Sequence, residues 1–314
     1  MAKQPTRHMA RYHIIHDTEY RYAAPVSLSR QLLHLTPRSV PWQSCVAHRL
    51  DIEPASALRL ERRDVFGNPV TLLALEFPHE QLRVRAEMTL DVSNQNWSTD
   101  RETPPWEAVR DRLAYRSGKA PQAGALAASR YRFESPYGRV KHDFAAYAAE
   151  CFAPGTALAD GVRALTSKIH RDFAFDTEAT NVATPVIEAF EARRGVCQDF
   201  AHVMVSCLRS LGLAARYVSG YILTTPPPGQ TRLIGADASH AWVSVWCPLD
   251  GEELWLDADP TNDVLPNCQH VTLAWGRDFS DVSPLRGVIL GGGSHELKVS
   301  VTMVPLDELA LGCV

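Results

Sequence analysis

The feature that most constrains the fold is a helical pattern that leads directly into strand-like runs. After Cys197 the apolar residues recur at the spacing of one buried helix face, and Gly212 follows as a residue that ends helices. That face consists of Phe200, Val203, Met204, Cys207, Leu208 and Leu211. The next runs are rich in strand-forming residues and comprise residues 215–223, 241–246 and 253–257. The pattern predicts an α+β fold in which helices pack on an antiparallel sheet.

Three chemically useful residues lie at the ends of these predicted elements. Cys197 falls in the first turn of the helix, after Gly195, where unpaired backbone N–H groups favour a thiolate. The same N–H groups, including that of Cys197, can face an oxyanion. His240 begins the second strand-like run, and Asp259, followed by Pro260, ends the third. Adjacent antiparallel strands would bring His240 and Asp259 together, facing the helix start. Such a Cys-His-Asp arrangement is suited to acyl transfer.

Each of these residues also has a purely structural interpretation. A cysteine can simply fill a core, a histidine can be satisfied at a strand end, and an aspartate before proline can form a turn. Asp257 lies on the same strand face as Asp259, so spacing leaves two candidate carboxylates. The supporting candidates around the three positions are Gln198, Asp199, Ser239 and Trp242. His202 should point away from Cys197, because five residues separate them on the helix.

The chain resembles the transglutaminase-like superfamily in three blocks. They are residues 195–202 (GVCQDFAH), 238–243 (ASHAWV) and 259–262 (DPTN). The resemblance extends over residues 10–304 and includes the β-rich start and the C-terminal segment of bacterial members. It implies a papain-like core with Cys197 as nucleophile, His240 as general base and acid, and Asp259 as the orienting carboxylate. It also favours Asp259 over Asp257.

The alternation of patterns along the chain predicts five regions. We expect an N-terminal tail (1–9), a β-sandwich domain (10–93), a polar linker (94–105), the transglutaminase-like catalytic core (106–265) and a C-terminal β segment (266–314) that packs on the core or the sandwich.

Composition restricts partners and compartment. A net charge of −4 gives no electrostatic reason to expect nucleic acid or an anionic membrane. The N-terminal residues lead into no apolar stretch, and no run approaches the ~20 apolar residues of a membrane span, so we expect a cytoplasmic protein. The seven cysteines show neither Cys-x-x-Cys nor zinc-site spacing. We therefore expect free thiols, no metal and no cofactor, and the sequence does not address oligomeric state.

The predicted function is a cysteine-dependent acyl transfer. We expect the hydrolysis of an amide or isopeptide bond in a peptide or protein substrate through a thioester on Cys197. The same three residues would serve a true transglutaminase that joins glutamine acyl groups to amines. A non-catalytic binding or scaffold protein that retains the fold is an alternative of another class.

Overall fold

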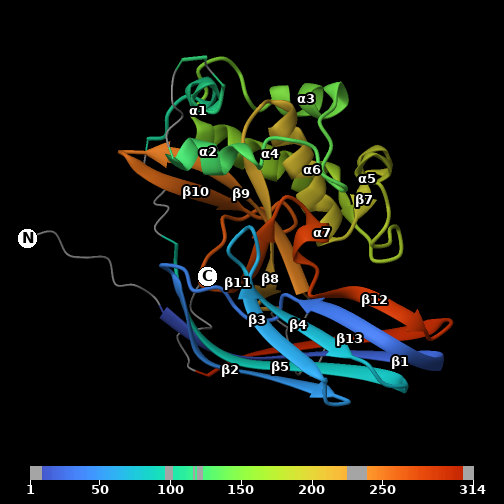
Figure 1. The fold of residues 1–314 in the computed structure, drawn as a ribbon. Coiled ribbons are helices and arrows are strands. Elements are labelled where there is room, and N and C mark those ends of the chain that lie inside the picture. Colours follow the sequence, from blue (N-terminus) through green and yellow to red (C-terminus); the bar gives the residue numbers. More distant parts are fainter. Residues whose placement is uncertain (1–8, 96–101, 116, 119–122, 225–238, 307–314) are drawn as a thin grey trace, which may run out of the picture.

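The structure is a computed structural model that describes residues 9–95, 102–115, 117–118, 123–224 and 239–306. Its elements form three layers (Figure 1). A large curled sheet lies on one side, a smaller sheet lies in the middle, and most helices cover the far face of the smaller sheet. Among the described residues, no helix is both long enough and apolar enough to span a membrane.

The large sheet contains seven antiparallel strands from both ends of the chain. They are β1 (Met9–Leu33), β2 (Gln43–Glu53), β3 (Leu58–Arg63), β4 (Pro69–Leu75), β5 (His79–Ser93), β12 (Leu285–Gly291) and β13 (His295–Pro305). Residues alternate between buried and exposed positions along β1 and β5, because one face packs on the core and the other meets solvent. This pattern confirms the predicted N-terminal β domain within an α+β fold.

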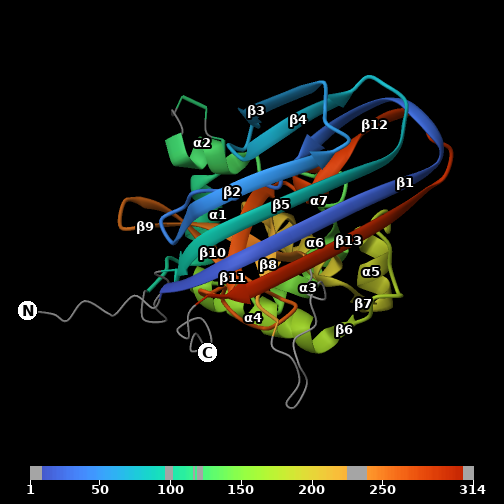
Figure 2. The same ribbon diagram turned by 90° about the horizontal axis from the view of Figure 1, so that it is seen from below.

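The strand β1 is common to both halves of the large sheet. Its first half lies between β5 and β13, and its second half lies between β4 and β12. Figure 2 shows β13 beside β1 along most of its length. The predicted sandwich is thus one continuous curled sheet in its hydrogen bonding, and the C-terminal strands complete it.

The smaller sheet carries the residues singled out in the sequence. Its strands are β8 (Ala215–Ile222), β9 (Ser239–Leu249), β10 (Glu252–Ala258) and β11 (His270–Gly276), in the order β10-β9-β8-β11. The first three match the strand-like runs of the sequence. β11 falls in the predicted C-terminal segment, so residues 266–314 contribute to both sheets. The domain limits themselves stay predictions.

The helix α6 (Cys197–Ser210) packs against β8 and β9 and lies at the centre of the helical layer. It ends as predicted, with Gly212 in the left-handed region at φ +82°. The other helices are α1 (Trp106–Arg112), α2 (Ala123–Ser129), α3 (His142–Ala149), α4 (Leu158–Asp172), α5 (Val186–Ala192) and α7 (Phe279–Val282). Two short strands, β6 (Ala174–Phe175) and β7 (Arg194–Gly195), pair in parallel just before α6.

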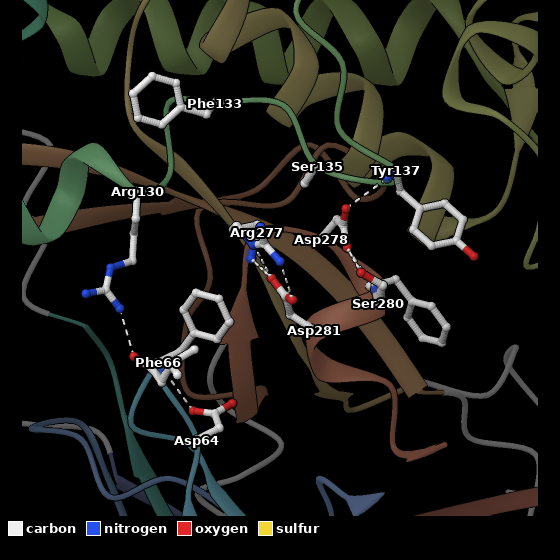
Figure 3. A network of polar contacts seen from close by, with 12 residues as sticks. Asp64, Phe66, Arg130, Phe133, Ser135, Tyr137, Arg277, Asp278, Ser280 and Asp281 are labelled. Carbon is white, nitrogen blue, oxygen red and sulfur yellow. Dashed lines mark hydrogen bonds and ion pairs between the residues drawn. The ribbon is translucent and has the colours of Figure 1, made fainter. Parts of the chain in front are cut away.

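Polar contacts join the two sheets. Gln43 of β2 exchanges two hydrogen bonds with the backbone of Thr272 in β11, each 2.8 Å long. In the turn between β3 and β4, Asn68 donates to the carbonyl of Trp275. Figure 3 shows this region, where Arg130 donates to the carbonyl of Val65 at 2.7 Å. The contacts of Gln43 and Asn68 fix the position of β11 relative to the large sheet.

The oxidation state of one cysteine differs from the expectation of free thiols. Cys268 is disulfide-bonded, so the prediction that it is a free thiol is wrong. Free thiols are found at Cys45, Cys151, Cys197, Cys207 and Cys247, and Cys313 lies outside the described residues.

Candidate active site

The turn before α6 holds Cys197 at the first position of the helix. Asp199 accepts hydrogen bonds from the backbone N–H of Val196 at 2.8 Å and from the hydroxyl of Thr180 at 2.6 Å. Burial raises the pKa of Asp199, although these hydrogen bonds oppose the shift. A Cβ at Gly195 would lie 2.4 Å from an Asp199 oxygen, so only glycine fits there. Asp199 therefore closes the helix start and fixes the backbone that carries the thiol.

The β9–β10 hairpin brings His240 and Asp259 together. The Nε2 of His240 donates to Oδ2 of Asp259 at 2.7 Å, and both side chains are buried. His240 lies at the start of β9, and Asp259 follows the end of β10, which pairs antiparallel with β9. The hairpin alone places the two residues at the same end of the smaller sheet, as expected from the strand pattern.

The thiol of Cys197 lies at this same end of the sheet. It is partly exposed and lies 3.9 Å from the carbonyl of Ser239, the residue before His240. Burial lowers the pKa of His240, but hydrogen bonds with Asp259 and Cys197 outweigh burial and raise it to about 10. Since Nε2 faces Asp259, Nδ1 is the ring nitrogen left for the thiol. The arrangement favours an imidazolium at His240 beside the thiol of Cys197.

Asp259 receives hydrogen bonds on both carboxylate oxygens. Oδ1 accepts from the backbone N–H groups of Thr261 at 3.0 Å and Asn262 at 3.4 Å. Oδ2 accepts from the Asn262 side chain at 2.7 Å and from Nε2 of His270 at 3.2 Å, in addition to His240. Burial opposes ionisation, but the hydrogen bonds from His240 and His270 hold the pKa of Asp259 well below its ordinary value. The carboxylate is thus anionic and tightly oriented.

The second candidate carboxylate, Asp257, has different partners. Its Oδ2 accepts from Nε1 of Trp242 at 3.1 Å and from the side chain of Gln95 at 2.9 Å. The indole of Trp242 in turn stacks on His240, with ring centroids 6.1 Å apart. Asp257 therefore acts on the imidazole only through Trp242, and the direct hydrogen bond belongs to Asp259.

The remaining candidates are arranged around this centre. The Gln198 side chain donates weakly to the carbonyl of Val182 at 3.4 Å. Ser239 contributes its backbone carbonyl beside the thiol. His202 accepts from the backbone N–H of Phe279 at 3.2 Å, and burial lowers its pKa to about 3. These contacts agree with the structural role expected for His202.

Two residues around Asp259 were not singled out in the sequence. Asn262 has a local signal, since it lies three residues after the aspartate, at a distance typical of turn hydrogen bonding. His270 has no such signal, because it comes from another strand. Among the described residues, His240, Asp259 and His270 also offer potential metal-ligand atoms within 4.8 Å of one another. Two imidazole N–H groups that donate to one carboxylate oxygen explain this proximity without an ion.

Comparisons with known proteins show the family of this chain. Residues 12–91 match the family model "Bacterial transglutaminase-like N-terminal region", and residues 145–260 match the model "Transglutaminase-like superfamily". An uncharacterised protein of Mycobacterium tuberculosis is 41% identical over 306 residues, which cover 96% of this chain and 95% of the relative. The chain belongs to the transglutaminase-like superfamily.

Other relatives of this superfamily are more distant. A protein-glutamine gamma-glutamyltransferase of Pseudomonas aeruginosa is 34% identical over 100 residues, which cover 31% of this chain and 14% of that enzyme. A solved structure from Cytophaga hutchinsonii, provisionally described as a cysteine protease, matches with a TM-score of 0.70 at 19% identity. The match covers 95% of this chain and 91% of that chain, and it shows that the fold is shared. Members of the transglutaminase-like superfamily are usually cysteine enzymes.

Proposed function

We propose that this protein is a cysteine-dependent enzyme that hydrolyses an amide or isopeptide bond in a peptide or protein. The observation that carries the proposal is the arrangement at one end of the smaller sheet, where the Cys197 thiol lies beside the residue that precedes His240 and His240 donates to Asp259. A nucleophile, a proton carrier and an orienting carboxylate are the three groups that acyl transfer on a thiol requires. Membership of the transglutaminase-like superfamily supports the same roles.

The first half of the reaction forms a thioester. Nδ1 of His240 takes the proton of Cys197, and the thiolate sulfur attacks the carbonyl carbon of the substrate amide. The resulting oxyanion faces the first turn of α6, where the Cys197 N–H has no partner within the helix. The C–N bond then breaks, and His240 gives its proton to the departing amine. Asp259 stabilises the imidazolium throughout, through the 2.7 Å hydrogen bond to Nε2.

The second half releases the acyl group. His240, now neutral, takes a proton from water as the water oxygen attacks the thioester carbonyl. The C–S bond breaks, the carboxylic acid leaves, and the proton on His240 returns to the Cys197 sulfur. Atoms balance with water as the only co-reactant, so no oxidant, reductant or cofactor is required.

A primary amine in place of water would give transglutamination, which is the second candidate. The local similarity to the glutamyltransferase of Pseudomonas aeruginosa favours it. We place hydrolysis first because small bacterial proteins that resemble this chain are often thought to be proteases or amidases. The third alternative is a scaffold without turnover, and it leaves unexplained why all three positions carry reactive groups in contact.

Mass spectrometry on a peptide pool tests these alternatives. The pool contains glutamine, asparagine and isopeptide bonds, and it is incubated with the protein and an excess of a labelled primary amine. Cleaved or deamidated peptides without the label, absent with Cys197→Ala, are the expected result. Labelled peptides would instead establish the transferase. An unmodified pool together with a Cys197 thiol of ordinary reactivity would support the scaffold.

The cytoplasmic location stays a prediction. The disulfide bond at Cys268 is a feature more typical of oxidising compartments. Fractionation of cells that express the protein with its native N-terminus would decide the location, because the active enzyme should be recovered in the cytoplasmic fraction if the prediction is correct.

A further inference from the structure

A second histidine contacts the carboxylate that orients His240. His270 is the first residue of β11, and it is almost completely buried. Its Nε2 lies 3.2 Å from Oδ2 of Asp259, the same oxygen that accepts from His240. Its ring also packs edge-on against Trp242, with centroids 5.4 Å apart. His270 thus contacts two of the side chains around the imidazole of His240, and its own ring lies with its centroid 6.0 Å from that of His240.

The hydrogen bonds of His270 determine its tautomer. Nδ1 lies 3.4 Å from the backbone N–H of Asn267 and accepts from it. In a neutral ring with an acceptor at Nδ1, the proton is on Nε2, which therefore donates to Asp259. Burial lowers the pKa of His270, although Asp259 opposes that shift. The ring is a neutral donor.

A neutral donor is suited to this position. A lysine or arginine at His270 would also hold the carboxylate, but its charge would cancel that of Asp259. The carboxylate would then stabilise an imidazolium at His240 less well. A neutral N–H restrains the carboxylate and leaves its charge available to His240. The rigid ring contacts Asn267 through Nδ1 and packs at a steep angle against Trp242, and these contacts keep that N–H in place.

We infer that His270 is a positioning residue that holds Asp259, still anionic, in the orientation in which it accepts the hydrogen bond from His240. The inference rests on the proposed function, since it takes the Cys197–His240 pair as the reacting pair. It assigns a task to β11, a strand outside the three blocks that resemble the superfamily.

The test measures the alkylation rate of Cys197 by iodoacetamide as a function of pH, with peptide mapping to separate this thiol from the other cysteines. Two variants are matched in size and polarity. In His270→Gln the amide nitrogen reaches the place of Nε2, whereas in His270→Asn it falls short of Asp259. We expect the Asn variant to react about tenfold more slowly at pH 6, the change that one pKa unit produces. The Gln variant should stay within about threefold of the wild type.

The control is another buried histidine that faces a carboxylate. His34 is about as buried as His270 and lies 3.4 Å from Asp64, between the large sheet and the turn before β4. His34→Asn should lower the melting temperature to a similar degree and leave the pH profile of Cys197 unchanged. Melting temperatures of all variants show which of them are folded, and His270→Leu provides a second donor-free variant if the Asn variant is not.

The outcomes separate this inference from the proposed function. If wild-type Cys197 titrates near the ordinary ~8.5 of a free thiol, the proposed function fails. If wild-type Cys197 is activated and a folded donor-free variant keeps the same profile, only the role of His270 is refuted. An equal shift in the Gln and donor-free variants, or in His34→Asn, would also refute it, because the effect would then not depend on the donor.

Discussion

The surroundings of Asp257 and Asp259 differ sharply, although both residues are buried and only two positions apart. Asp259 accepts from two histidine rings, one side-chain amide and two backbone N–H groups. Asp257 accepts from one indole and one side-chain amide, and its Oδ1 has no hydrogen-bond partner among the described residues. One carboxylate thus contacts the imidazole of His240, and the other contacts the indole that stacks on it. The comparison teaches that the hydrogen-bond partners of a buried carboxylate, local ones as well as those from other strands, decide its chemistry.

The largest expected effect comes from neutralising each carboxylate in turn. Asp259→Asn should reduce turnover about 10³–10⁴-fold, because the amide favours the wrong tautomer of His240 and cannot stabilise the imidazolium. Asp257→Asn should reduce turnover less than about tenfold, because Asp257 accepts a hydrogen bond from Trp242 and not from the imidazole of His240. Steady-state kinetics on the substrate found in the peptide pool measure both. Comparable losses in two folded variants would contradict the division of roles.

A smaller effect is expected when each carboxylate loses its side-chain amide donor. Asn262→Ala removes the 2.7 Å hydrogen bond to Asp259, and Gln95→Ala removes the 2.9 Å hydrogen bond to Asp257. The first should lower turnover about tenfold and raise the pH at which Cys197 becomes reactive, since Asp259 is less well held. The second should change turnover less than about threefold. A larger loss for Gln95→Ala would reverse the comparison.

The pH dependence of stability should also distinguish the two carboxylates. The pKa of Asp259 is lowered in the folded state, so its contribution to the free energy of unfolding is present above its unfolded pKa of ~3.9 and is lost as the pH falls. The pKa of His240 is raised to about 10, so its contribution is fully present below ~6.5 and is lost as the pH rises through about 10. The difference in unfolding free energy between the wild type and Asp259→Asn should therefore be greatest between about pH 4 and 6.5.

Urea unfolding at several pH values measures that difference. For Asp257→Asn we expect that the difference in unfolding free energy from the wild type has no maximum between about pH 4 and 6.5. The reason is that Asp257 has no histidine as a direct hydrogen-bond partner. If the difference in unfolding free energy between the wild type and Asp259→Asn did not change with pH, the His240–Asp259 pair would not be charged in the folded protein.

The smallest effect concerns the indole. Trp242→Phe keeps an aromatic ring but removes the N–H that donates to Asp257 at 3.1 Å. We expect a loss of about 1–3 kcal/mol in the free energy of unfolding, since a buried carboxylate loses a donor. A double-mutant cycle with Asp257→Asn should give a coupling energy of roughly 1 kcal/mol. Coupling of the same size between Trp242→Phe and Asp259→Asn would show that the two carboxylates are not separate.

Local patterns in the sequence predict much of the catalytic core. The apolar spacing after Cys197 predicts α6, and Gly212 marks its end. Leu158, Val162, Leu165 and Ile169 recur at helical spacing in the sequence, and they form the buried side of α4. The pair Thr184-Pro185 has the sequence of a helix cap and a first-turn proline, but Pro185 itself is the N-cap of α5. The hairpin that joins His240 to Asp259 follows from strand pattern and a short connection.

What could not be predicted depends on contacts between distant segments. Strand alternation places Asp257 and Asp259 on one face, and their different hydrogen-bond partners distinguish them. His270 reaches the site because β11 pairs with β8 at the edge of the smaller sheet. The pairing of β12 and β13 with β1 likewise has no local signal. Tertiary packing decides each of these contacts, and the hydrophobic periodicity of the sequence carries no information about it.

The pairing of β1 with β13 has a consequence for synthesis on the ribosome. Tyr12 pairs with Pro305, so β1 is synthesised almost 300 residues before the strand with which it pairs. Until then the nascent chain presents an unpaired edge along one side of β1, which is a template for pairing with other chains. The segment that carries Cys197, His240 and Asp259 is made in the interval. Correct maturation therefore requires that this edge be shielded, or that the central segment fold first and limit its access.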